Sequence, residues 1–368
     1  MKTITLHIGL PKTGSTSLQA FCSKNQAQLT QLGVYYPTEG RYFHQMAQHV
    51  WARALKGPHY RFWWTDPADM EFSLPACHQE LMAHIEASNC PNILLSAEEL
   101  WHNNVPETLG TLFEGFPYQV RILAYLRRQD SLLLSAYNQC IKTADLRLPD
   151  RHHIGTFDEF VHIELGDAES LFNFYPLLSQ FARVFGQENV MVRVFEPSQL
   201  VGGDLIQDCL KVLDIAQSEA FEIPEPMNKS LPQELIDIMR LFNSQAKLAR
   251  NEHLRFNYLL RDMPKFMALE DYQPMSPELR WQILEHYRED NARVAREFLG
   301  REDGQLFYPE ISDREASWTA FPRLSTATVA RTVVQMWAQE QERNQFFRAT
   351  LANLEAEYAQ LGAQGGQA

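Results

Sequence analysis

The sequence predicts an α/β protein with a central, mostly parallel sheet flanked by helices, followed by a helical C-terminal extension. Short apolar runs rich in β-branched residues alternate with segments of helical periodicity over the first two thirds of the chain. This alternation favours a parallel sheet that is covered on both faces. Polar motifs follow the carboxyl ends of the predicted strands, where open α/β sheets bind their ligands. From about Pro224 onward the pattern is helical and more polar.

The elements follow in a regular order along the chain. Buried strands are expected over residues 3–10, 92–97, 118–126 and 189–195, with a short extended segment at 34–37. The first strand is followed by a helix whose apolar face carries Leu18, Phe21, Cys22, Leu29 and Leu32. Further helices are expected over 43–55, 131–142, 204–213, 232–242, 277–298 and 329–361, and an irregular segment over 57–75.

The length of 368 residues favours two parts. We assign residues 1–240 to one α/β domain and residues 241–368 to a helical extension. One alternative is that this extension packs on the first domain. The last helix carries a short seam of apolar residues at Phe347, Leu351, Leu354, Tyr358 and Leu361. This seam indicates docking on the chain's own domain, a frayed tail or a homo-oligomer contact.

The composition limits the possible partners and compartments. A net charge of −13 argues against a general nucleic-acid binder but leaves room for a small anionic ligand. Five scattered cysteines without a CxxC pair indicate reduced thiols. The sequence shows neither a signal peptide nor an apolar run of membrane-spanning length, so we expect a cytoplasmic protein.

The loop after the first strand has the composition of an anion-binding site. It reads Gly9-Leu10-Pro11-Lys12-Thr13-Gly14-Ser15-Thr16-Ser17 and lies between a strand and a helix. Such a loop presents backbone N–H groups and the positive end of a helix dipole to phosphate or sulfate. Gly9, Gly14 and Thr16 fit the spacing of a Walker A loop, but Ser15 occupies the lysine position and the lysine lies earlier, at Lys12.

The segment from Pro11 to Ser17 resembles the 5′-phosphosulfate loop of sulfotransferases that use 3′-phosphoadenosine 5′-phosphosulfate (PAPS). The resemblance implies that Lys12 contacts the bridging oxygen and the sulfuryl group of PAPS. It also implies that Thr13, Gly14, Ser15, Thr16 and Ser17 hold the 5′-phosphate.

A second segment resembles the 3′-phosphate motif of the same family. Arg127 follows the third strand and Ser135 lies eight residues later on the next helix, which are the two positions of that motif. The guanidinium of an arginine suits a phosphate because it is planar and permanently charged. The chain departs from the family in having Arg128-Gln129 after the first arginine, so Arg128 is a possible substitute contact. Lys229 is a third basic candidate for the 3′-phosphate.

Sulfuryl transfer also needs a base within reach of the acceptor hydroxyl. Glu98, just past the second long strand, is the first candidate, and its position resembles that of the base in carbohydrate-directed members of the family. Glu99 and His44 are the alternatives. Four tryptophans could stack on a sugar ring or belong to the core: Trp51, Trp63, Trp64 and Trp101.

Together, these motifs predict a PAPS-dependent sulfotransferase that needs no metal and acts on a hydroxyl of a carbohydrate or glycolipid. Two other functions stay open at this stage. A nucleotide-dependent kinase could use the same loop, although it would lack the Walker lysine and would need Mg²⁺. A non-catalytic protein could bind the nucleotide without turnover.

Overall fold

The computed structural model describes residues 2–38, 74–143, 155–168, 170–216, 221–224, 231, 233–245, 260, 275–308, 317–319 and scattered positions between 329 and 345. The chain forms two compact units. The first comprises Met1–Ala136, Phe157–Lys229 and Pro277–Ala316, and the second comprises Tyr137–Thr156, Ser230–Ser276 and Ser317–Ala368.

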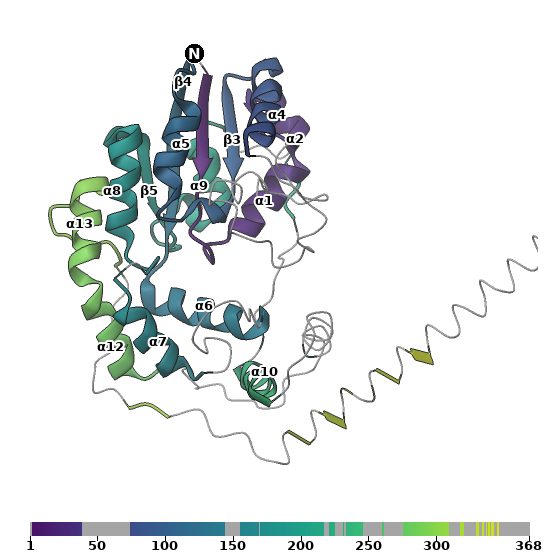
Figure 1. Ribbon diagram of the computed structural model, residues 1–368, viewed down its shortest axis with the longest axis vertical. Helices are drawn as coiled ribbons and strands as arrows, with labels where there is room; N and C mark the ends of the chain where they lie inside the picture. The colour runs from purple at the N-terminus through teal and green to yellow at the C-terminus, as the bar shows by residue number, and fades with distance from the viewer. Residues whose placement is uncertain are drawn as a thin grey trace, which may run out of the picture. The chain divides into compact units, whose positions relative to one another are not determined.

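The first unit is built on a parallel sheet of five strands, in the order β2-β3-β1-β4-β5 (Figure 1). The strands are β1 (Lys2–His7), β2 (Val34–Tyr35), β3 (Asn92–Ser96), β4 (Tyr118–Leu126) and β5 (Val190–Val194). The predicted α/β class with a parallel sheet is confirmed. β1 is central, and the loop that follows it emerges between the carboxyl ends of β3 and β4.

Both faces of the sheet are buried, as a parallel sheet requires. On one face, Ile4 and Leu6 of β1 pack with α4 (Leu74–Ala87), α5 (Val105–Phe113), α8 (Phe174–Phe185) and α13 (Arg288–Leu299). In Figure 1, α8 and α13 lie next to each other beside β5. The other face is covered by α1 (Ser15–Lys24), α2 (Gln26–Gln31) and α9 (Leu205–Val212).

Two predicted helices are each divided in the structure. The helix expected after β1 breaks at Asn25, whose buried side-chain amide donates to the Phe21 carbonyl (2.9 Å) and the Glu222 carbonyl (2.8 Å). The amide oxygen of Asn25 accepts from the Glu222 N–H at 2.7 Å. The helix expected over 277–298 is α12 (Pro277–His286) followed by α13, because Tyr287 leaves the helical conformation and caps α13.

Some of the other helices were predicted from the sequence and others were not. The predicted helices at 131–142 and 232–242 correspond to α6 (Gln129–Thr143) and α10 (Gln233–Gln245). The sequence pattern did not reveal α4, α5, α7 (Phe157–Gly166) or α8. Three 3₁₀ turns complete the described elements: η1 (Glu98–Leu100), η2 (Gln187–Asn189) and η3 (Val201–Gly203).

Several expectations concern residues that the structure does not describe. The helix expected over 43–55 lies outside the described residues, as does the segment 57–75 apart from its last two positions, which begin α4. The apolar seam from Phe347 to Leu361 also lies outside them. Among the helices that are described, none has both the length and the apolar character to cross a membrane.

Candidate functional site

The loop after β1 stays attached to β4 beyond the end of the regular strand. The Ile8 N–H donates to the Leu123 carbonyl (3.0 Å) and the Leu10 N–H donates to the Tyr125 carbonyl (3.1 Å). The Tyr125 N–H donates in turn to the Gly9 carbonyl at 2.8 Å. The strand predicted to reach residue 10 ends at His7, because Gly9 adopts a positive φ of 101°. The loop therefore starts from a backbone that β4 holds in place.

Gly9 brings the loop close to the end of β3. A Cβ at this position would lie 3.1 Å from the Pro11 nitrogen and 3.4 Å from both Cα and Cβ of Glu98. The positive φ and the close approach both favour glycine here. Glu98, the first candidate base, is thus a direct neighbour of the loop, and it is half-buried with Glu99 in η1.

The second half of the loop turns sharply into α1. Lys12 has a φ of 70° and Gly14 a φ of 81°, so two residues within three adopt the left-handed conformation. A Cβ on Gly14 would lie 2.7 Å from a methyl carbon of Leu205 in α9. Gly14 is the N-cap of α1, and the N–H groups of the first turn of a helix have no intrahelical acceptor. These groups can bind an anion.

The four hydroxyl groups of the loop fall into two pairs. Thr13 and Ser15 are buried, and both donate to the Leu10 carbonyl, at 2.6 Å and 3.1 Å. Their hydroxyls hold the turn together, so they can serve a ligand chiefly through their backbone N–H groups. Thr16 and Ser17 are half-buried at the start of α1, where their hydroxyls are more accessible to a ligand.

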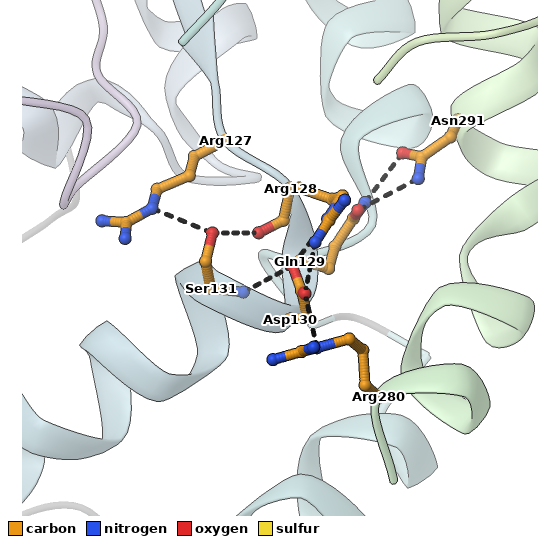
Figure 2. Close-up of polar contacts among 7 residues, drawn as sticks. All are labelled: Arg127, Arg128, Gln129, Asp130, Ser131, Arg280 and Asn291. Atoms are coloured by element: carbon orange, nitrogen blue, oxygen red, sulfur yellow. Dashed lines mark hydrogen bonds and ion pairs between the residues drawn. The ribbon is translucent and has the colours of Figure 1, made fainter. Parts of the chain in front are cut away.

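Arg127 joins the two motifs that the sequence analysis singled out. Its Nη1 donates to the Lys12 carbonyl at 3.0 Å, across a separation of 115 residues. Its Nε donates to the Ser131 hydroxyl at 3.1 Å (Figure 2). Burial lowers the pKa of the Arg127 guanidinium, and the charge of Asp130 acts in the opposite direction. Ser135, the expected partner in the motif, is half-buried one turn further along α6.

Arg128 is committed to a different contact. Its Nε and Nη2 donate to the two carboxylate oxygens of Asp130, at 2.9 Å and 2.8 Å. Arg280 of α12 approaches the same carboxylate at 3.3 Å, and the amides of Gln129 and Asn291 bond to each other (2.8 Å and 3.0 Å; Figure 2). Asp130 and Gln129 thus join the start of α6 to α12 and α13. The bidentate contact of Arg128 with Asp130 disfavours Arg128 as a substitute phosphate contact.

Two buried polar groups beneath the loop were not predicted. His7 Nδ1 lies 2.8 Å from the Ser96 hydroxyl, which also accepts from the Gln19 side-chain amide at 3.1 Å. Burial lowers the pKa of His7 to about 4, so the imidazole is neutral at physiological pH. His7 and Ser96 are the last residues of the neighbouring strands β1 and β3, and their side chains lie on the same face of the sheet. The alternation of side chains along each strand could have indicated that they are close.

The second buried group is centred on Asp208 of α9, which is 0% exposed. Its carboxylate accepts from Arg193 Nε (2.9 Å), Arg193 Nη2, the Tyr125 hydroxyl (2.9 Å) and the Val201 N–H (3.0 Å). Burial alone would raise the pKa of Asp208, but these hydrogen bonds and the charge of Arg193 outweigh it and hold the pKa below its ordinary value. The group joins β4 and β5 to α9.

The other candidates are either in the core or outside the described residues. Trp101 is 1% exposed, and its indole N–H donates to the Leu171 carbonyl at 2.9 Å, so it is a core residue rather than an acceptor contact. His44, Lys229, Trp51, Trp63 and Trp64 lie outside the described residues. Within the part of the chain that is described, no group of three His, Cys, Asp or Glu side chains is arranged to hold a metal ion.

Comparison with known proteins finds partial similarities in sequence and in structure. No protein-family model matches the chain. An uncharacterized protein of Archaeoglobus fulgidus is 29% identical over 213 residues, which cover 56% of this chain and 54% of that protein. The chain thus spans about half the length of this curated relative. A solved sulfotransferase structure from Alicyclobacillus acidocaldarius is similar at a TM-score of 0.40 and 18% identity, over 66% of this chain and 95% of that one.

Proposed function

We propose that the chain is a sulfotransferase that moves the sulfuryl group of PAPS to a hydroxyl of a carbohydrate or glycolipid acceptor. The hydrogen bond from Arg127 to the Lys12 carbonyl is the observation that carries this proposal. It brings an arginine at the end of β4 into contact with the loop at the N-terminus of α1. A donor that carries phosphates at the 5′ and 3′ positions of its ribose would need both parts, the loop for one phosphate and the arginine for the other.

The donor would occupy the carboxyl edge of the sheet around β1. In this proposal the loop from Pro11 to Ser17 holds the 5′-phosphosulfate through its backbone N–H groups and the hydroxyls of Thr16 and Ser17. Arg127 and Ser135 bind the 3′-phosphate, with Lys229 as a further contact. Of the five N–H donors of a guanidinium, Arg127 uses two. The other three have no acceptor among the described residues and remain for a phosphate.

The proposed reaction is an in-line transfer. The acceptor oxygen forms a bond to sulfur while the bond between sulfur and the bridging oxygen of the 5′-phosphate breaks, which releases adenosine 3′,5′-bisphosphate. The acceptor proton passes to Glu98, which lies against Gly9 of the loop. Lys12 stabilises the charge that develops on the leaving phosphate. Glu99 and His44 are the alternative bases.

Calorimetric titration with adenosine 3′,5′-bisphosphate, with and without Mg²⁺, tests the donor site. We expect metal-independent binding to the wild type that is stronger than binding of AMP or ATP, and weaker binding to Arg127→Ala. Arg183→Ala is the matched control, because Arg183 is an exposed arginine of α8 that pairs with Glu107. Absence of binding, or a preference for ATP with Mg²⁺, would overturn the proposal and favour the kinase alternative.

Turnover must then be shown separately from binding. Incubation with PAPS and a panel of sugar and glycolipid acceptors, analysed by mass spectrometry, should give a product heavier by one sulfuryl group. Glu98→Gln should lose the product while it keeps the affinity for adenosine 3′,5′-bisphosphate. Tight nucleotide binding without any product across the panel would favour a non-catalytic binding protein.

A further inference from the structure

We propose that Ser131 is a positioning residue that fixes the Arg127 guanidinium for the 3′-phosphate of the donor. This inference rests on the proposed function, because it assigns a role within the same donor site. It concerns a residue that the two-position motif of Arg127 and Ser135 does not include. Ser131 lies in the first turn of α6, four residues after Arg127.

The hydroxyl of Ser131 has a fixed direction. It lies 3.0 Å from the Arg128 carbonyl, which can only accept, so the single hydroxyl proton of Ser131 points to that carbonyl. The lone pairs of the same oxygen then face the Arg127 Nε–H at 3.1 Å. Ser131 therefore acts towards Arg127 only as an acceptor. Figure 2 draws both contacts.

Two contacts determine the plane of the Arg127 guanidinium. Nε is held by Ser131 on α6, and Nη1 is held by the Lys12 carbonyl on the loop. The two anchors hold different edges of the fork, and Nη2 carries two N–H groups that no described residue accepts. Because a guanidinium is rigid and planar, fixing two nitrogens directs these remaining donors as well.

The contacts of the Arg127 guanidinium are separate from those of Arg128. Asp130 takes both Nε and Nη2 of Arg128 and also receives Arg280, and it is only 2% exposed. In Figure 2 the guanidinium of Arg127 points away from that carboxylate. The Asp130 oxygen Oδ1 additionally accepts from the Ser131 N–H at 2.7 Å, which fixes the backbone of Ser131 itself.

The consequence for the ligand is specific to one phosphate. Without the Ser131 hydroxyl, Arg127 keeps its charge and one tether but gains rotational freedom. Binding of a ligand that carries the 3′-phosphate should therefore weaken, while binding of one that lacks it should not change. A residue that merely stabilised the fold would weaken both ligands alike or neither.

The test compares Ser131→Ala, Ser131→Thr and Arg127→Ala by calorimetry with adenosine 3′,5′-bisphosphate and with AMP. We expect Ser131→Ala to bind the bisphosphate about tenfold more weakly, through loss of one charge-assisted hydrogen bond, with unchanged AMP affinity. Ser131→Thr should restore the affinity. In the Arg127→Ala background, Ser131→Ala should have no further effect. Arg128→Ala is the matched control and should not alter the ratio of the two affinities.

A second readout needs no ligand. The Arg127 Nε–H should give a protected NMR resonance in the wild type and in Ser131→Thr, and a rapidly exchanging one in Ser131→Ala. Wild-type and Ser131→Ala proteins with equal affinity for the bisphosphate, or equal Nε–H protection, would overturn the positioning role. If the wild type fails to bind the bisphosphate while the NMR difference is present, the proposed function fails and the tether from Ser131 to Arg127 stands. In that case its role at a 3′-phosphate is overturned.

Discussion

Removal of the Asp208 carboxylate should be among the most destabilising single changes in the first unit. Asp208→Ala leaves three donors without their acceptor: the guanidinium of Arg193, the Tyr125 hydroxyl and the Val201 N–H. Loss of one partner from a buried ion pair typically costs 3–5 kcal/mol. The Arg193 side chain is 32% exposed and can regain some hydration, so we expect a loss near the lower limit, about 3 kcal/mol.

Two other variants serve as a partial removal and as a control. Tyr125→Phe removes a single donor and leaves the ion pair intact, so it should cost about 1 kcal/mol. Asp204→Ala is the matched control on the same helix. Asp204 is exposed and caps α9 by accepting from the Gln207 N–H at 2.9 Å, and loss of such a cap costs about 1 kcal/mol.

Hydrogen exchange of peptides from β4 and β5, followed by mass spectrometry, measures the opening free energy where the contacts lie. The lowered pKa of Asp208 means that its ionised form stabilises the fold at neutral pH. This stabilisation is lost as the pH falls below the ordinary carboxyl pKa towards the lowered one, so the difference between wild type and Asp208→Ala should shrink below about pH 4. The reasoning is refuted if Asp208→Ala costs no more than Asp204→Ala, or if the difference grows on acidification.

Three further predictions concern single positions in the first unit. Gly14→Ala should destabilise the protein more than Gly115→Ala in urea unfolding. Both glycines have a positive φ, but only at Gly14 would a Cβ lie 2.7 Å from another side chain, so equal losses would contradict this. Burial raises the pKa of Asp290 to about 6, so its contribution to stability should fall as the pH rises from about 4 to 6. Melting temperatures measured across this pH range should show the fall in the wild type but not in Asp290→Asn, and parallel curves for the two proteins would contradict the prediction. The His7 imidazole should stay neutral in NMR titrations until about pH 4, and a midpoint near 6.5 would show that it is not buried as described.

The sequence predicted the sheet well because its strands are buried on both faces. The four long apolar runs correspond to β1, β3, β4 and β5, with ends within about three residues, a typical error for strand boundaries. The largest error is at β1, where the apolar run continues to Leu10 but Gly9 ends the regular strand. Local hydrophobicity alone does not reveal the backbone conformation that such a glycine adopts.

The helices were predicted less well, for two physical reasons. Continuous helical periodicity conceals a break when the residue at the break serves a distant partner, as Asn25 does for Glu222 across 197 residues. The ends of α5 and α8 carry residues that mark turns as well as helix ends: Asn104 and Asn173 are the N-caps, and Gly186 is the C-cap of α8.

For the candidate site, the motifs predicted which segments meet but not how each side chain is used. Arg127 was expected to face a ligand with Ser135, and the structure adds Lys12 and Ser131 as its protein partners. Thr13 was expected to hold a phosphate, and its hydroxyl points inward to the Leu10 carbonyl instead. Hydrogen bonds to backbone carbonyls depend on the folded path of the chain, so a motif cannot specify them.

The central place of β1 has a consequence for the synthesis of the protein. β1 is synthesised before its neighbours β3 and β4, which end only at Ser96 and Leu126. At roughly 5–20 residues per second, about 6–24 s pass between completion of His7 and completion of Leu126. Both edges of β1 lack their partners until Ser96 is complete, and the edge that pairs with β4 lacks its partner until Leu126 is complete. We therefore expect the nascent chain to depend on chaperones until β4 emerges, and the loop after β1 to take its shape only then.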